Sequence, residues 1–159
     1  MKQKSGLGRV PRQPEVIASR ENQWVRRFRA ALSGERERGA DTIAGIEGVR
    51  LVGEALRSGL PVEAVLISES GRKHLAGISL QLAPSTRLLA VADRTFANIA
   101  DTQSPQGIAA LVHPKQWGFD DILRGASTLV VVLCGVQDPG NVGTILRAAE
   151  SLGATGAAA

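Results

Sequence analysis

Short apolar stretches alternate with amphipathic ones from residue 42 onward, and this alternation constrains the possible folds more than any other feature of the sequence. The apolar stretches predict strands at 42–46, 62–67, 87–92 and 107–113. Between them we expect helices at 48–58, around 71–77, and from a capping Asp93 to about residue 99. Strands that alternate with helices along a chain are typical of an α/β sandwich with a mostly parallel sheet.

The N-terminal part combines a predicted arm with one amphipathic helix. Residues 1–16 are rich in Lys, Arg, Gly, Pro and Gln and poor in apolar side chains, so we predict a mobile arm there. A helix is expected over about 20–33, with Ser19 as its N-cap. One face of this helix carries an apolar stripe of Val25, Phe28 and Leu32.

The net positive charge of the chain comes from its first 38 residues. Residues 1–38 contain ten Lys and Arg against four Glu, whereas residues 39–159 contain nine against eleven acidic residues. A basic segment of this kind is typical of nucleic-acid binding, and also of a solubilising tail. The chain has only five aromatic residues and no Tyr, which argues against base stacking and favours recognition of RNA by shape and backbone.

A second domain is predicted to begin at residue 128, after a linker at 114–127 that contains a short helical turn. The run Thr128–Cys134 is almost entirely apolar, which predicts a strand that is covered on both faces. A helix follows at about 142–152, with Asn141 as its N-cap. One strand and one helix cannot bury their own apolar faces, so we expect this domain to be truncated in the sequence.

Composition excludes several classes of protein. The chain is 43% hydrophobic and 21% charged, which excludes disorder over most of its length. It has no apolar run near the length of about 18 residues that a membrane span needs, and no signal-peptide pattern. The single Cys134 excludes an internal disulfide and is expected in the core, and the cytoplasm is the expected compartment. His74 and His113 are isolated, so no metal site is predicted.

The segment Gly135–Gly153, GVQDPGNVGTILRAAESLG, is the one that points to chemistry. A strand end, a tight turn and a helix start present backbone N–H groups to an anion. Asn141 stands where a P-loop requires Lys, and the dinucleotide pattern G-x-G-x-x-G is absent. Three polar side chains remain as candidates, Asn141, Arg147 and Glu150, which are also consistent with an ordinary helix cap and a surface ion pair at i,i+3 spacing.

The stretch DPGNVGTILRAAESLG resembles the first signature motif of the SpoU (TrmH-like) branch of the SPOUT RNA methyltransferases. Upstream, Ser19-x-x-Asn22, Arg38 nine residues before Glu47-Gly48, and Ser104-Pro105-Gln106-Gly107 resemble that branch's substrate-binding domain. The resemblance implies a small α/β sandwich that binds RNA at residues 17–113. It also implies, at residues 128–159, the first βα unit of a truncated trefoil-knot α/β domain.

The same resemblance implies an activity, the transfer of a methyl group from S-adenosylmethionine to a ribose 2′-hydroxyl of rRNA or tRNA. Arg147 would contact the phosphate of the target nucleotide and help to activate the hydroxyl, Asn141 would order the loop, and Glu150 would hold Arg147. The cofactor motifs of the family are absent from this sequence, so we expect no methylation by this chain alone. The complete protein is expected to form a homodimer. The alternative is a non-catalytic RNA-binding module.

RNA contacts are predicted for the basic helix and its flanks. The residues expected to make them are Arg20, Asn22, Arg26, Arg27, Arg29, Arg36 and Arg38. Gln106 and Gly107 are expected to form a turn that supports the sheet. Both tryptophans, Trp24 and Trp117, are interpreted as packing residues and not as base-stacking ones.

Overall fold

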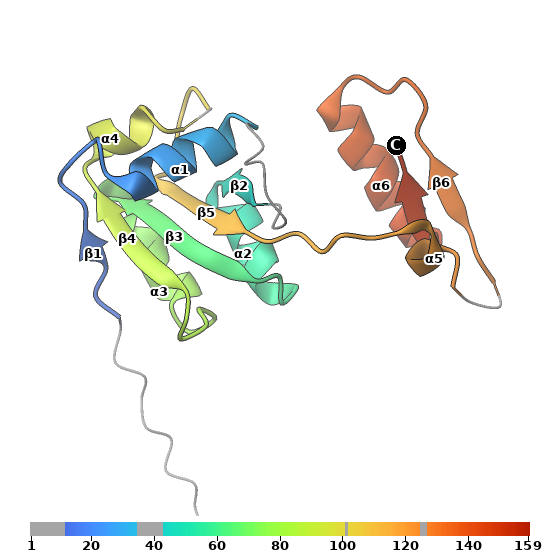
Figure 1. Ribbon diagram of the computed structural model, residues 1–159, viewed down its shortest axis with the longest axis horizontal. Coiled ribbons are helices and arrows are strands. Elements are labelled where there is room, and N and C mark those ends of the chain that lie inside the picture. The colour runs from blue at the N-terminus through green and yellow to red at the C-terminus, as the bar shows by residue number, and fades with distance from the viewer. Residues whose placement is uncertain (1–11, 35–42, 101, 125–126) are drawn as a thin grey trace, which may run out of the picture. The chain divides into compact units, whose positions relative to one another are not determined.

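The computed structural model describes residues 12–34, 43–100, 102–124 and 127–159. The chain divides into two compact units, residues 1–114 and residues 115–159 (Figure 1). Arg36 and Arg38 lie outside the described residues.

The first unit is built on a five-stranded mixed sheet. Its strands are β1 (Glu15–Val16), β2 (Ala44–Glu47), β3 (Val62–Ser68), β4 (Arg87–Val91) and β5 (Ile108–Val112). They lie in the order β1-β4-β3-β5-β2, with β4 parallel to β1 and β3, and β5 antiparallel to β3 and β2. The expectation of a mostly parallel sheet is therefore wrong. The reason is that β5 enters the sheet at the end where β3 leaves it, where the Ser68 N–H donates to the carbonyl of Gly107.

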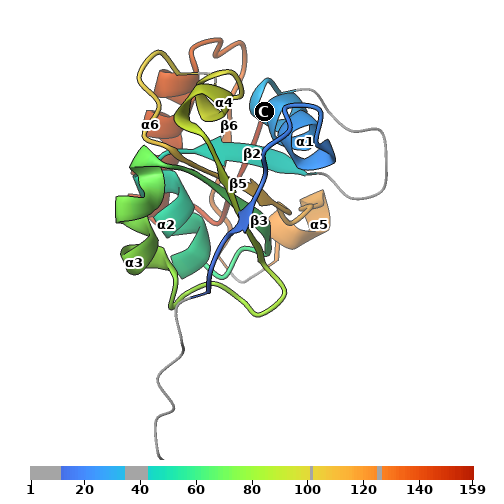
Figure 2. The ribbon, with the colours of Figure 1, turned by 90° about the vertical axis from the view of Figure 1, so that its left-hand side faces the viewer.

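Helices cover both faces of this sheet and make a three-layer α/β sandwich (Figure 2). These helices are α1 (Gln23–Leu32), α2 (Val49–Arg57), the 3-10 helix η1 (Ser70–His74), α3 (Leu75–Ile78) and α4 (Asp93–Ala97). Successive residues of β3 supply opposite faces: Ala64 and Leu66 pack with α1 and α4, whereas Val65 and Ile67 pack with α2 and α3. All four are fully buried, so the predicted sandwich is confirmed.

The structure corrects the predicted N-terminal boundary. Glu15 and Val16 pair with β4, and the buried Ile17 donates its N–H to the carbonyl of Ala90. The predicted arm at 1–16 is thus wrong for its last residues. Helix α1 is capped by Asn22, whose side chain accepts a hydrogen bond from the Trp24 N–H, and not by the predicted Ser19.

The second unit contains α5 (Phe119–Ile122), β6 (Val130–Val132), α6 (Pro139–Ser151) and β7 (Gly156–Ala158). Strands β6 and β7 are parallel, so the unit is a βαβ arrangement and not the single strand and helix that we expected. The predicted strand at 128–134 is reduced to three residues. Helix α5, expected within a linker, packs in this unit, since Ile122 lies where a Cβ on Gly156 would be.

Burial in the second unit differs from the prediction. Val132 is 65% exposed, and Cys134 and Trp117, both expected in a core, are exposed as well. Strand β6 has β7 as its one pairing partner among the described residues, so its apolar side chains are only partly covered. Lys115 instead places its ammonium group 3.5 Å from the centre of the Trp117 ring.

Candidate functional site

The carboxyl ends of β2, β3 and β4 and the start of β5 meet at one edge of the first unit's sheet. Two glycines hold the loops of this edge together. Gly107 has φ of +74°, and a Cβ on Gly71 would overlap the backbone of Gly107. The predicted structural role of the Gln106-Gly107 turn is confirmed, because a side chain at Gly71 or at Gly107 would overlap the facing loop.

Gln106 also completes the start of α2. The helix follows Gly48, which has no side chain to cap it, and the Gln106 Oε1 accepts a hydrogen bond of 2.8 Å from the Val49 N–H. A residue 57 positions away in sequence therefore satisfies a backbone donor that a cap normally satisfies. The residues around Val49 in the sequence do not indicate this contact, because its partner is so distant.

Ser68, Ser70 and Asp93 form a hydrogen-bonded cluster beside this turn. The Asp93 Oδ1 accepts bonds of 3.0 Å and 2.8 Å from the N–H and the hydroxyl of Ser70. Hydrogen bonding from the Ser68 and Ser70 hydroxyls and the Ser70 N–H lowers the pKa of Asp93. Asp93 was expected to cap α4, but it lies inside that helix and its carboxylate instead fixes the start of η1.

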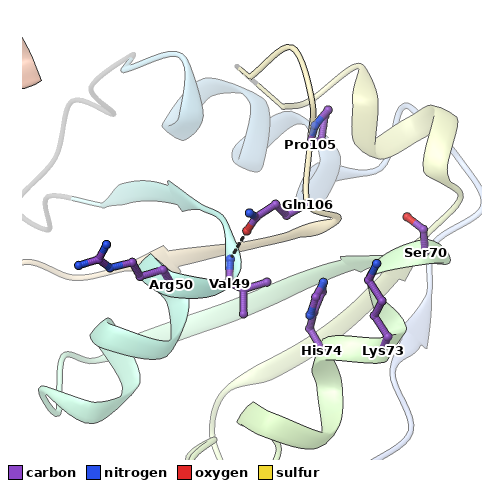
Figure 3. Close-up of a pocket in the computed structure, with 7 residues that line it drawn as sticks. All are labelled: Val49, Arg50, Ser70, Lys73, His74, Pro105 and Gln106. Atoms are coloured by element: carbon purple, nitrogen blue, oxygen red, sulfur yellow. Dashed lines mark hydrogen bonds between the residues drawn. The ribbon is translucent and has the colours of Figure 1, made fainter.

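A surface hollow of about 620 Å³ lies between η1, the first turn of α2 and this loop (Figure 3). Lys73 and His74 project from η1 toward Gln106, and Arg50 extends from the first turn of α2. No acidic side chain lines the hollow. Sequence reasoning missed these cations. The available signal was their position shortly after strands β2 and β3, which run in the same direction on either side of β5 and so end at the same edge of the sheet.

The predicted RNA-binding residues of α1 fall into two groups. Arg20, Arg26 and Arg29 are exposed, as expected. Asn22 uses its side-chain oxygen as the helix cap. Arg27, also predicted to contact RNA, is only partly exposed.

Arg27 makes a bidentate ion pair with Glu63 through both of its terminal nitrogens. Nη1 and Nη2 donate to the Glu63 carboxylate at 2.6 Å and 2.9 Å, and the guanidinium lies 4.8 Å from the centre of the Trp24 ring. The Arg27 hydrogen bonds lower the pKa of Glu63. A further contact of this carboxylate joins Glu63 Oε2 to His113 Nε2 at 3.2 Å. Glu63 and Trp24 thus hold Arg27 in place, and the buried Trp24 is the packing residue we expected.

In the second unit, Asp138 and not Asn141 caps helix α6. Its carboxylate accepts bonds from the N–H groups of Gly140 and Asn141, with Pro139 at the first helical position. The N-cap prediction for Asn141 is wrong because a carboxylate three residues earlier takes both backbone donors.

Arg147 lies one turn above Thr144, and its Nη2 donates to the Thr144 hydroxyl at 3.2 Å. Among the described residues, no ion pair joins Arg147 to Glu150, although both are exposed on α6. The structure thus places Asn141, Arg147 and Glu150 on one exposed helix without bonding them to one another.

Two findings concern other kinds of site. The described part of the chain contains no group of three or more His, Cys, Asp or Glu side chains arranged to hold a metal ion. Within the same residues, no helix is long and apolar enough to span a bilayer.

Comparison with known proteins places the chain in a family. Residues 22–110 match the family of MRM3-like substrate binding domains. The chain is 31% identical over 137 residues to the 23S rRNA (guanosine(2553)-2′-O)-methyltransferase RlmP of Bacillus subtilis, covering 86% of this chain and 51% of that protein. It is 36% identical over 120 residues to the "Putative TrmH family tRNA/rRNA methyltransferase" of Staphylococcus haemolyticus, covering 70% of this chain and 47% of that protein.

Solved structures agree with this placement. The SpoU methyltransferase AviRb from Streptomyces viridochromogenes, in complex with AdoMet, has a TM-score of 0.68 at 25% identity, covering 86% of this chain and 52% of that one. An rRNA methyltransferase from Sinorhizobium meliloti has a TM-score of 0.67 at 25% identity, covering 91% and 54%. The chain spans about half the length of the curated relatives it matches. With its substrate-binding domain at 22–110 and the motif on α6, the chain belongs to the SpoU (TrmH-like) family of SPOUT RNA methyltransferases.

Proposed function

We propose that this chain supplies the RNA-binding domain and the first catalytic motif of a methyltransferase that transfers a methyl group from S-adenosylmethionine to a ribose 2′-hydroxyl of rRNA or tRNA. One observation carries the proposal: a substrate-binding domain of this family and the DPGNVGTILRAAESLG motif occur in one chain in the family's order. The relatives named as 2′-O-methyltransferases of RNA support the reaction type.

The first unit offers the RNA-binding side. Exposed Arg20, Arg26 and Arg29 lie on or beside α1, and the hollow beside α2 carries Lys73 and His74. Neutralising phosphates with such cations releases counterions and makes binding steeply dependent on salt. Arg27 is assigned a structural role instead, since Glu63 already holds its guanidinium.

The second unit offers the proposed catalytic residues. Arg147 is assigned to a phosphate of the target nucleotide, and its charge would stabilise the developing alkoxide of the 2′-oxygen. A guanidinium donates hydrogen bonds and has no acceptor, so the proton of the hydroxyl must go elsewhere, with the RNA phosphate as the proposed acceptor. Thr144 orients Arg147 in this structure, and Glu150 and Asn141 are proposed to hold it and the loop in the RNA complex.

The described residues of the second unit do not form a cofactor pocket on their own. Cys134, Gly135, Gln137 and Asp138, which follow β6, are all exposed, whereas a nucleoside cofactor requires a concave site that buries most of its surface. S-adenosylmethionine would supply the methyl group when bound, and no residue of this chain is assigned to it. The homodimer and the cytoplasmic location stay predictions.

The alternative is a non-catalytic RNA-binding module. It is favoured by the contrast between a first unit with a buried core and a second unit in which no described residue is buried. The two proposals differ in whether methyl transfer accompanies RNA binding.

The test uses the full product of the gene, a transcript of the 23S rRNA segment around the nucleotide named for the B. subtilis relative, and S-adenosylmethionine with a tritiated methyl group. We expect RNA binding and label in the ribose, and we expect Arg147→Ala to lower transfer by about 100-fold or more, with a much smaller loss of RNA affinity from the single phosphate contact. The matched control is Arg124→Ala, which removes an exposed arginine of the same unit. RNA binding without transfer would establish the non-catalytic module, and absence of RNA binding would overturn both readings.

A further inference from the structure

Helix α2 and the η1–α3 segment lie side by side on one face of the first unit's sheet (Figure 2). The hollow of Figure 3 is not isolated there. A second hollow of about 270 Å³ continues from it along α2 and shares Val49, Lys73 and His74 with it. We call the two together the α2–α3 groove, marked by Arg50, Gly53, Arg57, Lys73, His74 and Gly77.

The side chains of this groove are cationic and uncompensated. Neither hollow is lined by a carboxylate. Among the residues that the structure describes, Arg50, Arg57, Lys73 and His74 make no ion pair, whereas Arg27 and Arg87 of the same unit are paired with Glu63 and Glu15.

Two glycines shape the groove. Gly53 has no side chain of its own and is buried, and the Nη1 of Arg57 lies 3.2 Å from where a Cβ on Gly53 would be. The Arg57 guanidinium thus folds back along α2 and does not extend away from it. At Gly77 a Cβ would meet nothing within 4 Å, so a ligand backbone can approach α3 closely there.

We propose that the α2–α3 groove binds the sugar-phosphate backbone of the RNA substrate, in a stretch that runs from the sheet edge to the last turn of α2. The proposal rests on the proposed function, which makes RNA the substrate. Helix α2 has nine residues and is about 14 Å long, which sets the length of RNA backbone that the groove can contact. The groove offers donors and positive charge, the chemistry that phosphates require, and it is lined by no Phe, Tyr or Trp.

The test measures binding of the fluorescein-labelled 23S rRNA transcript to the full chain by anisotropy, over a series of salt concentrations. The test variant is Arg57→Glu with Lys73→Glu. We expect its affinity to fall by about 10-fold or more and the slope of log affinity against log salt to become shallower by about 2, since two phosphate contacts are lost. The paired Arg57→Gln and Lys73→Gln variant should show the same slope change with a smaller loss of affinity.

The control variant reverses a charge elsewhere on the same unit. Arg94→Glu changes an exposed arginine on α4, which packs on the opposite face of the sheet. It serves as the baseline for a non-binding surface, and we expect less than about a 2-fold effect from it. Thermal unfolding of every variant checks the fold, and the substituted positions Arg57, Lys73 and Arg94 are all exposed.

The outcomes separate the two proposals. If the unsubstituted chain fails to bind the transcript, the proposed function fails. If it binds and the groove variants bind as tightly as Arg94→Glu, the groove assignment alone is overturned. Tighter binding of poly-L-glutamate than of RNA, abolished by the same variants, would assign the groove to an acidic protein and also overturn it.

Discussion

The two units of the chain use the same alternation of strand and helix but reach different degrees of burial. In the first unit, Leu66 of β3 and Leu111 of β5 are completely buried between two helical layers. In the second unit, none of the described residues is fully buried, and Leu152 of the helix end is 80% exposed. An apolar strand is buried by the neighbours it has on both sides, and not by its own composition.

This difference extends to how firmly each unit holds its loops. The edge of the first unit is fixed by contacts between distant segments, such as Gln106 with Val49 and Gly71 against Gly107. The loop before α6 is fixed by local bonds within three residues, from Asp138 to the next N–H groups. The first unit, which we propose binds RNA, is therefore preorganised by tertiary packing, whereas the loop of the proposed catalytic residues in the second unit depends on short-range capping.

The largest expected effect tests the difference in burial directly. Phe28→Ala removes a completely buried ring and is expected to lower the free energy of unfolding of the first unit by about 3–5 kcal/mol. Leu152→Ala, at an exposed position, is expected to change the stability of the second unit by less than about 0.5 kcal/mol. Urea unfolding followed by Trp24 fluorescence in a Trp117→Phe background reports on the first unit, and Trp117 fluorescence in a Trp24→Phe background reports on the second. Equal losses from the two substitutions would contradict the comparison.

A smaller effect tests the packed edge. Gly71→Ala places a methyl group on the backbone of Gly107, so we expect a loss of about 2–3 kcal/mol. Gly77→Ala is the matched control, since a Cβ there has open space within α3 and removes flexibility from the unfolded chain, which predicts a gain of up to about 1 kcal/mol. Thermal unfolding by circular dichroism measures both. A neutral Gly71→Ala would show that the edge rearranges freely.

The smallest effect concerns the ion pair on α1 and depends on pH. The Arg27 hydrogen bonds lower the pKa of Glu63 from its ordinary value of 4.5, so the pair stabilises the fold above that value and loses this contribution as the pH falls through the folded-state pKa. Glu63→Gln should therefore cost about 1–2 kcal/mol at neutral pH and progressively less below pH 4.5.

The exposed pair of Glu15 and Arg87 provides the comparison for this prediction. Both side chains are more than half exposed, so Glu15→Gln should change stability by less than about 0.5 kcal/mol at any pH. Urea unfolding at several pH values measures both variants. A Glu63→Gln cost that is independent of pH would assign the loss to packing and not to charge.

Much of the first unit was predictable from local pattern. The strands at 62–67, 87–92 and 107–113 and the helix at 48–58 lie within a few residues of their observed positions, because alternating burial and helical periodicity are both written into adjacent residues. The direction of β5 was not predictable, since it depends on where the loop before Gly107 crosses the sheet.

The candidate sites divide along the same line. The motif on α6 was recognisable because its residues are neighbours in sequence, although its cap proved to be Asp138. The cations Arg50, Arg57 and Lys73 were missed because they come from two elements, α2 and η1, that only the sheet brings together. Arg27 was assigned to RNA because nothing near it in sequence indicates Glu63, 36 positions away.

The sequence by itself determined the α/β class, the positions of most elements and the family, since these depend on periodicity and on one contiguous motif. Only the tertiary structure decided which arginines are free to bind and which are already paired, and which apolar strand is truly buried. The physical reason is that burial and ion pairing are properties of contacts between distant segments. Those contacts exist only after the sheet has set its strand order.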